Sequence, residues 1–334
     1  MKILAKIRLV NVLIVMIMVM IINIEINSQS INNTGEEVRD SIILKSVKNL
    51  PVLNNFRFIS SDVINNPFIT SYIKTSVGAG TAVNLTSYIK DLDGNILEKF
   101  SGRISFITAD ILFQIAVNNW MALSGKYEGF ARLGTNTYTI LTSGISYATG
   151  YSLGAKVKIW GNNKMMLSGS LDYNRSKVFL YSIYEFAKKV LESGTINKNL
   201  LVRDDIISTF ISVDYAFAPA DWCGLLAVAG WGVGNPFNSK DRGNVRVGLA
   251  TSVDFDNIKY VGIPVGVLLS VKFNSFLESG ENNTNVLTYG LRIGYTGHKD
   301  FDVGIENTYQ SLNYQLSDEK INTLLTAIKL RYYF

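Results

Sequence analysis

The chain repeats one pattern over most of its length: apolar residues occupy alternate positions in long segments between residue 69 and the C-terminus. In the first of these segments Ile69, Ile73 and Val77 fall in one register, whereas Lys74 and Ser76 fall in the other. Successive side chains of a β-strand point to opposite faces, so the segment predicts a strand with one apolar and one polar face. Such alternation outlasts the ~5–6 residues of an average strand. The pattern therefore predicts a sheet of unusually long strands.

The alternation recurs along the chain and predicts about 12 strands. The segments that carry it are 69–85, 107–117, 120–130, 145–159, 165–173, 207–217, 225–233, 245–255, 261–273, 287–295, 301–305 and 324–334. Short connections are expected at 118–119, 161–164, 218–221, 256–259 and 296–300. Longer ones are expected at about 86–100, 131–143, 175–203, 234–243, 274–284 and 310–321. Tight turns at one end, longer loops at the other and an even strand number are typical of a transmembrane barrel. We therefore expect an all-β, antiparallel, up-and-down transmembrane β-barrel over residues 68–334.

The composition fits this class better than the others. Hydrophobic residues make up 47% of the 334 residues and charged residues 18%, which is too apolar for a disordered chain. After the N-terminus no apolar run reaches the ~20 residues of a membrane helix. A closed barrel can still cross lipid, because its sheet pairs all of its own backbone groups. Cys223 and His298 are single residues of their kinds, which excludes a disulfide scaffold and a four-ligand zinc site. We expect neither a metal nor a cofactor.

Residues 1–28 have the build of a secretory signal peptide. Three basic residues precede an apolar run of about 14 residues, Leu9 to Ile22, and a polar stretch follows. The run is short for a membrane helix, so we expect cleavage, with the cut after Ser28. The alternative is an uncleaved anchor helix.

The last residues carry a more specific signal. Leu330, Tyr332 and Phe334 alternate up to the final position. This ending resembles the C-terminal assembly signal of Gram-negative outer-membrane β-barrel proteins. The resemblance identifies a porin- or channel-like class and no single family. It implies insertion by the barrel-assembly machinery, contact with outer-membrane lipid, and both chain ends in the periplasm.

Residues 29–67 precede the first strand and mix charged residues with short apolar runs. One interpretation is a plug or hatch inside the barrel, and the other is a periplasmic tail. Fatty-acid and hydrocarbon transporters of the outer membrane have an N-terminal hatch, but no motif here assigns the chain to them. In the longest loop, Ser182–Leu191 has helical spacing; a short helix over the barrel mouth and an ordinary ordered loop both remain open.

The polar register of the predicted strands holds fifteen charged residues and many serines. Charge on the lipid side costs several kcal/mol, so we expect these side chains to line the lumen. The predicted lumen residues are Asp110, Lys126, Glu128, Lys156, Lys158, Asp172, Asp214, Arg246, Asp254, Lys272, Arg292, Asp302, Glu306, Lys329 and Arg331. Basic and acidic groups nearly cancel, whereas a strongly selective pore has a one-sided ring. The interior is either a weakly selective aqueous path or a network of ion pairs that fills a narrow barrel.

Two further expectations concern the short-turn end. Outward aromatic residues there predict a periplasmic aromatic girdle; they are Phe217, Phe255, Tyr295, Phe301, Tyr332 and Phe334. Pro264 falls within a predicted strand although proline lacks a donor for the ladder, so either the strand starts later or a bulge lies there.

Motifs for other functions do not match. His298 falls in a predicted turn, away from any partner for general-base catalysis. The glycine-rich run Gly230–Gly234 lies within a strand and lacks the lysine of a phosphate loop, and Asp91–Gly94 predicts a hairpin turn rather than a calcium loop. No Lys/Arg patch with interleaved aromatics is present, so nucleic-acid binding is not expected.

The sequence therefore favours a non-enzymatic passive channel or transporter for small solutes in the outer membrane. Two alternatives remain open. One is a closed structural barrel whose extracellular loops bind a partner and whose lumen is packed shut. The other is a transporter of hydrophobic ligands, which requires an apolar pocket between a hatch and the wall.

Overall fold

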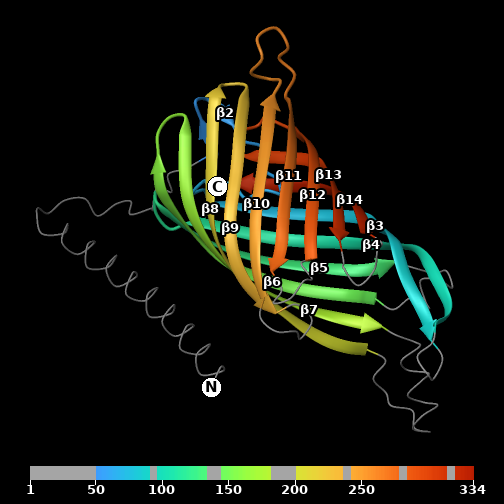
Figure 1. Ribbon diagram of the computed structural model, residues 1–334. Coiled ribbons are helices and arrows are strands. Elements are labelled where there is room, and N and C mark those ends of the chain that lie inside the picture. The colour runs from blue at the N-terminus through green and yellow to red at the C-terminus, as the bar shows by residue number, and fades with distance from the viewer. Residues whose placement is uncertain are drawn as a thin grey trace, which may run out of the picture. The chain divides into compact units, whose positions relative to one another are not determined.

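The computed structural model describes residues 50–90, 96–133, 144–181, 201–235, 242–277, 284–313 and 320–334. Within them, twelve antiparallel strands form one closed barrel, in which each strand pairs with its neighbours in sequence and β14 pairs with β3 (Figure 1). The barrel strands are β3 (Tyr72–Lys90), β4 (Ile96–Ala116), β5 (Met121–Leu133), β6 (Gly144–Gly161), β7 (Met165–Tyr181), β8 (Leu201–Ala220), β9 (Cys223–Asn235), β10 (Arg242–Asp254), β11 (Val265–Leu277), β12 (Thr284–Tyr295), β13 (Phe301–Asn313) and β14 (Lys320–Tyr333). The predicted fold class and strand number are confirmed.

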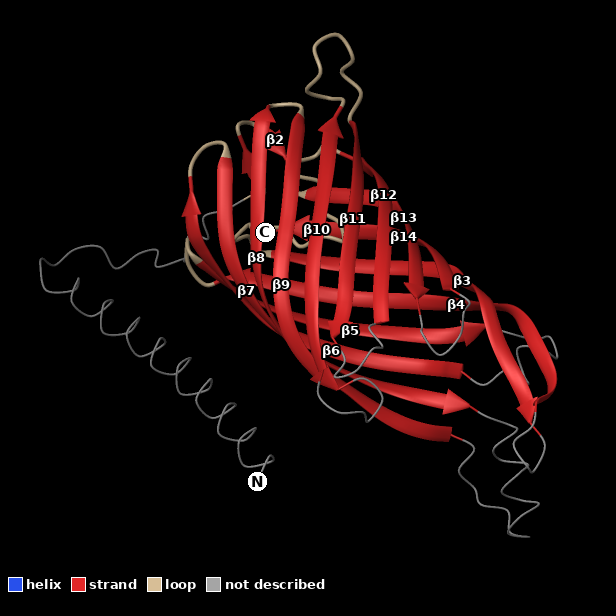
Figure 2. Cartoon of the chain, in the orientation of Figure 1, coloured by secondary structure: helices blue, strands red, loops and turns tan. Residues whose placement is uncertain are grey.

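Two short strands precede the barrel. β1 (Val52–Leu53) and β2 (Phe56–Arg57) form a small antiparallel sheet, and the chain then runs without regular structure to Tyr72. Figure 2 shows strands joined by loops in the coloured part of the chain. Among the described residues, no helix is long and apolar enough to cross a membrane. The predicted signal peptide, the Asp91–Gly94 turn and the Ser182–Leu191 segment lie outside the described residues.

The connections at the two ends of the barrel differ less in length than the sequence predicts. At the end that holds Tyr72 and Phe334, the connections span 117–120, 162–164, 221–222, 255–264 and 296–300, and at the other end they span 91–95, 134–143, 182–200, 236–241, 278–283 and 314–319. The predicted long loops 86–100 and 175–203 were too wide, because β3, β4, β7 and β8 continue past their apolar stretches. Backbone pairing needs no alternation of side chains, so polar strand ends escape the pattern.

The connection 255–264 corrects a second expectation. The predicted turn 256–259 was too short, because β11 begins only at Val265. Pro264 therefore precedes the strand, where its missing N–H costs no ladder bond. Two residues of this connection, Tyr260 and Gly262, have φ angles of 74° and 56°. Such positive angles allow the chain to reverse over a wider hairpin than the sequence suggested.

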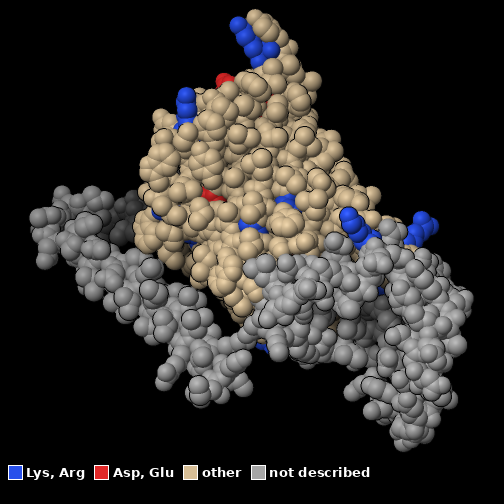
Figure 3. All heavy atoms as spheres, in the orientation of Figure 1, with Lys and Arg blue, Asp and Glu red and all other residues tan. Residues whose placement is uncertain are grey.

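The outer face of the barrel is apolar. Val77, Leu249 and Ile328 are 65%, 53% and 63% exposed, and they belong to the apolar register of their strands. Figure 3 shows few charged side chains on the described part of the wall that faces the viewer. The strands are 12 to 21 residues long, more than the ~9–11 needed to cross a bilayer. An apolar outer belt on a closed sheet of this length is the form of a membrane-spanning barrel.

The aromatic girdle at the Phe334 end is present. Tyr295, Phe301, Tyr332 and Phe334 are exposed, and the rings of Phe301 and Tyr332 lie 5.0 Å apart. Three exposed tryptophans at the same end were missed, since they sit in or beside turns; they are Trp120, Trp160 and Trp222. Amphipathic rings of this kind belong at a membrane–water interface.

The apolar core lies against the inner wall and not between two sheets. Phe56, Phe58, Ile59 and Ile64 are at most 3% exposed and cluster with wall residues such as Leu226. Further wall residues of the cluster are Met166, Ala216, Val228, Ala250 and Leu268. We call residues 50–71 the internal segment. Its burial follows from small residues in the wall: a side chain at Gly224 would overlap the ring of Phe56, and one at Gly248 would overlap Ile64.

We predict that Phe56→Ala lowers the free energy of unfolding by about 3–5 kcal/mol, because it leaves a cavity where a fully buried ring lay. Denaturant unfolding of the barrel in detergent micelles measures the loss. Val52→Ala is the matched control: Val52 is 38% exposed, so its change should stay within about 0.5 kcal/mol. Equal losses for both variants would contradict this packing.

Candidate functional site in the barrel lumen

The fifteen charged residues predicted for the lumen share one face of the barrel. Strand registers link them, as Lys329 pairs with Ser76, Ser76 with Asp110, and Asp110 with Glu128. Seven are buried: Asp214, Asp254, Arg292, Asp302, Glu306, Lys329 and Arg331. Six are half-buried: Asp110, Lys126, Lys156, Asp172, Arg246 and Lys272. Two are exposed, Lys158 and Glu128. The same face meets the internal segment, so this face is the inner wall.

A first cluster joins the internal segment to four strands, β3, β4, β13 and β14, by ion pairs. Lys329 Nζ lies 2.6 Å from Asp62 and 2.5 Å from Glu306. Lys74 Nζ also pairs with Asp62 and lies 3.2 Å from Asp110. Two ammonium groups and three carboxylates thus alternate across the inner wall. We call these five residues the lysine–carboxylate cluster.

Asp62 is the centre of this cluster. Burial alone would raise the pKa of Asp62, but the ammonium groups of Lys74 and Lys329 outweigh it and hold that pKa well below its usual range. Its side chain keeps 35% of its exposure. Asp62 is therefore a carboxylate at neutral pH, and it bridges the two ammonium groups that the wall carboxylates Asp110 and Glu306 also face.

A second cluster lies nearer the short-turn end. Arg292 donates to Asp302 at 2.6 Å, and Ser60 Oγ donates to the same carboxylate at 2.5 Å. Arg292 also donates to Ser60 Oγ at 3.1 Å. Ser61 Oγ donates to Glu306 at 3.0 Å and so connects this cluster with the first. The three bonds of Ser60 and Ser61 join the internal segment to strands more than 230 residues away in sequence.

Wall side chains also hold the backbone of the internal segment. Gln114 Nε2 donates to the carbonyl oxygen of Thr70 at 2.9 Å, and Ser168 Oγ donates to that of Pro67 at 2.5 Å. The ammonium group of Lys156 donates to the Asn66 carbonyl oxygen. At the rim, Arg57 donates to the carbonyl oxygens of His298 and Phe301. The internal segment therefore has polar partners on strands all around the barrel.

Arg246 and Lys272 differ from the other inner-wall cations. Neither forms an ion pair with a described residue. The Arg246 guanidinium instead lies 4.2 Å from the centre of the Phe210 ring, and its Nε has no hydrogen-bond partner among the described residues. Arg331 shows a related stacking on Tyr72, also at 4.2 Å, but it also bonds Tyr333.

The remaining predicted groups have local roles. Asp214 accepts from Ser170 and Ser212, and Asp254 accepts from Thr296 Oγ1 at 2.8 Å at the start of the 255–264 connection. His298 is exposed in its turn. Its Nδ1 accepts from the backbone N–H of Asp300. Among the described residues, no group of three or more His, Cys, Asp or Glu side chains could hold a metal ion.

Sequence reasoning missed Ser60, Asp62 and Lys74 as site residues. Lys74 carries a readable signal, since it falls in the polar register of the first strand beside Ser76. Ser60 and Asp62 lie in a segment without periodicity, and no pattern connects them with strands near the other end of the chain. The side chains of the assembly signal, Leu330, Tyr332 and Phe334, are exposed on the outer face; their recognition by the assembly machinery stays a prediction.

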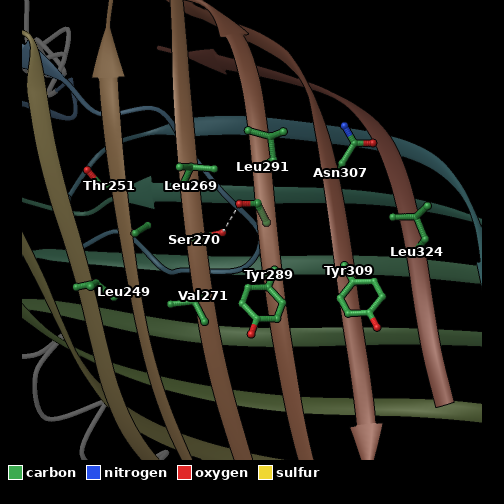
Figure 4. A pocket seen from close by; sticks show the side chains of 12 residues that line it. Leu249, Thr251, Leu269, Ser270, Val271, Tyr289, Leu291, Asn307, Tyr309 and Leu324 are labelled. Atoms are coloured by element: carbon green, nitrogen blue, oxygen red, sulfur yellow. Dashed lines mark hydrogen bonds between the residues drawn. The ribbon is translucent and has the colours of Figure 1, made fainter. Parts of the chain in front are cut away.

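A described hollow lies on the other side of the wall. It measures about 520 Å³ and lies on the outer face of β10 to β14, with Leu249, Leu269, Tyr289 and Tyr309 in its lining (Figure 4). In Figure 4 these side chains stand along neighbouring strands and leave an open apolar surface. Such a lining suits lipid and offers almost nothing for polar chemistry, so the candidate site is the inner wall.

No family model matches the chain, and no curated protein matches it significantly. Solved structures of similar form are outer-membrane barrels. The translocator domain of the autotransporter NalP from Neisseria meningitidis is 9% identical, with 80% of this chain and 90% of that chain covered and a TM-score of 0.47. An outer-membrane channel from Pseudomonas putida F1 is also 9% identical, with 83% and 100% covered and a TM-score of 0.47. The NanC porin is 8% identical, with 78% and 99% covered and a TM-score of 0.43.

We predict that Asp302→Asn lowers the free energy of unfolding by about 3–5 kcal/mol, because it leaves the buried Arg292 without its carboxylate. Unfolding in detergent micelles measures it. Lys126→Gln is the control: it breaks a pair with Glu128 in which both side chains are partly exposed, worth about 0–1 kcal/mol. A larger loss from Lys126→Gln would refute the ranking.

A closed sheet with an apolar outer belt and a charged inner wall is the form that a β-barrel takes in a membrane. The chain is a 12-stranded transmembrane β-barrel of the bacterial outer membrane.

Proposed function

We propose that the barrel is a passive channel for small polar solutes, and that the internal segment closes the short-turn half of its lumen. The observation that carries this is the ring of polar contacts between residues 54–70 and the inner wall. In the closed state the segment fills the space with Phe56, Phe58 and Ile64. Solutes pass when it is displaced.

The bonds of the internal segment suit a displaceable closure. Ion pairs and hydrogen bonds inside a wet lumen exchange for water at modest cost, whereas a strand of the barrel could not leave its ladder. The inner face of β10 and β11 carries charged and amide side chains such as Arg246, Lys272 and Asn274, which suit a water-filled path. Catalytic groups play no part in this proposal, and the chain acts as a non-enzymatic barrel.

One alternative has an observation in its favour. The lysine–carboxylate cluster runs across β3, the internal segment, β14 and β13, as expected for a structural barrel whose lumen is packed shut. A hydrophobic-ligand transporter has less support, because the apolar space between segment and wall is filled by the chain's own side chains.

Single-channel conductance in planar bilayers separates these functions. We compare the full chain with a variant whose residues 52–69 are replaced by a Gly/Ser linker of equal length. The channel proposal predicts rare, small openings for the full chain and a stable, larger conductance for the variant. Folding of both is checked by the shift in gel mobility on heating.

Two outcomes would count against the proposal. No openings in a folded linker variant would favour the structural barrel. Equal conductance of both chains would show that the internal segment does not close the lumen.

The pH dependence gives a second test. The pKa of Asp62 is lowered in the folded state, so its ionisation stabilises the docked segment above the usual value of 3.8 and is lost only as pH falls below it. Acidification from pH 7 to pH 5 should therefore leave the closed state of the full chain unchanged. Asp62→Asn removes the charge at every pH and should raise the open fraction throughout. A steep rise of the wild-type conductance between pH 7 and pH 5 would disprove this role of Asp62.

A further inference from the structure

The inner-wall cations divide into two groups. Lys74, Lys329 and Arg292 face carboxylates in ion pairs, and Lys126 pairs with Glu128. Lys156 and Arg331 have other oxygen partners, the Asn66 carbonyl and the Tyr333 hydroxyl. Lys158, which is exposed next to the 162–164 connection, has no such partner among the described residues, and neither have the half-buried Arg246 and Lys272. The inner wall is therefore nearly neutral where it meets the internal segment, and it carries unpaired positive charge beside it.

Arg246 and Lys272 are close neighbours. Arg246 lies on β10 opposite Asn274 of β11, and Lys272 lies on β11 opposite Gly248 of β10. They therefore occupy diagonal positions on one face, with Cα atoms about 7–8 Å or less apart. Two cations held at this distance favour an anion between them.

Phe210 fixes the orientation of Arg246. The guanidinium carbon lies 4.2 Å from the ring centre, the distance of a cation–π contact. Nε is buried and has no partner among the described residues. Gly230 and Gly232 of β9 lie between Arg246 on β10 and Phe210 on β8, so the arginine reaches the ring across two positions that carry no side chain. A guanidinium held in this way offers a planar set of donors, which can bind a carboxylate with two hydrogen bonds.

Two amides complete the surroundings. Asn244 precedes Arg246 on the same face and is only 6% exposed, and its Oδ1 has no partner among the described residues. The Oδ1 of Asn274, opposite Arg246, is also without a partner there. A buried acceptor without a donor is unfavourable, so this place favours a molecule that brings hydroxyl groups.

The acidic groups nearby do not cancel the two cations. Asp172 and Asp214 are the carboxylates that act on Arg246. Asp214 is already held by the hydroxyl groups of Ser170 and Ser212. Asp172 on β7 lies opposite Phe210 on β8. The strand of Phe210 therefore lies between Asp172 and Arg246, which is on β10. The carboxylates that act on Lys272 are Asp62 and Glu306, and both are held in ion pairs by Lys74 or Lys329. Asp172 thus stands alone against two cations.

We propose that Arg246, Lys272, Phe210, Asn244 and Asn274 form a lumen site for small carboxylates that also carry hydroxyl groups, such as sugar acids. This inference rests on the proposed channel function and names its substrate class. The site borders the internal segment, because Gly248, opposite Lys272, lies against Ile64. A bound solute would therefore touch the closure itself.

Calorimetric titration of the full chain in detergent micelles tests the site without relying on conductance. The probes are glucuronate, which has both groups, glucose, which lacks the carboxylate, and acetate, which lacks the hydroxyls. We expect glucuronate to bind at least tenfold more tightly than either. Arg246→Gln combined with Lys272→Gln should weaken glucuronate binding at least tenfold. Lys126→Gln, an inner-wall cation that has its own carboxylate, is the matched control and should bind as the wild type does.

If the double variant does not fold, Arg246→Lys keeps the charge and removes the planar fork, and it should weaken glucuronate binding more than acetate binding. Equal glucuronate binding in wild type and the Arg246 and Lys272 variants would overturn the proposal. So would the absence of glucuronate binding in a wild-type barrel whose linker variant conducts. Glucuronate binding without any conductance would leave this site standing and refute the channel instead.

Discussion

Lipid offers no hydrogen-bond partner to a peptide group, and the rest of the structure depends on this constraint. It requires the sheet to close, which it does where β14 pairs with β3 from Tyr333 and Tyr72 onward. Closure gives every strand one face toward lipid and one toward the lumen. One register of each strand is accordingly apolar and exposed, as at Leu249 and Ile328, while the other register turns Lys329 and Arg292 inward. A two-residue period in the sequence is the direct result.

The inner wall then has to accommodate charge and volume. A buried ion pair contributes little net stability, since desolvation offsets most of its attraction, but an unpaired partner is costly. The pairs around Asp62 and Asp302 therefore fix where the internal segment lies more than they stabilise the barrel. Gly224 and Gly248 provide the space for Phe56 and Ile64. Small wall residues, apolar plug residues and ion pairs together define one position of the segment.

The sequence predicted the barrel because lipid imposes a local, periodic pattern, which even the weak segment 120–130 retained as part of β5. Strand ends were less predictable: β8 begins at Leu201, where the sequence no longer alternates between apolar and polar residues. The charged inner face followed from the same period. The contacts of the internal segment could not be predicted, because Ser60 and Asp302 meet across most of the chain and no local pattern relates them. Nor could the sequence single out Arg246 and Lys272, because the ion pairs of other inner-wall cations, such as Lys329 with Asp62, depend on contacts between residues that are distant in sequence.

The central claim is that residues 50–71 lie buried against the inner wall, and thiol protection tests it most directly. Cys223→Ser provides a background without thiols, into which Ile64→Cys places one thiol at a position that is 1% exposed and Val52→Cys places one that is 38% exposed. The account predicts that a hydrophilic maleimide labels the folded barrel rapidly at position 52 and slowly at position 64, with both labelled after unfolding. Equally rapid labelling of the two folded variants would contradict it.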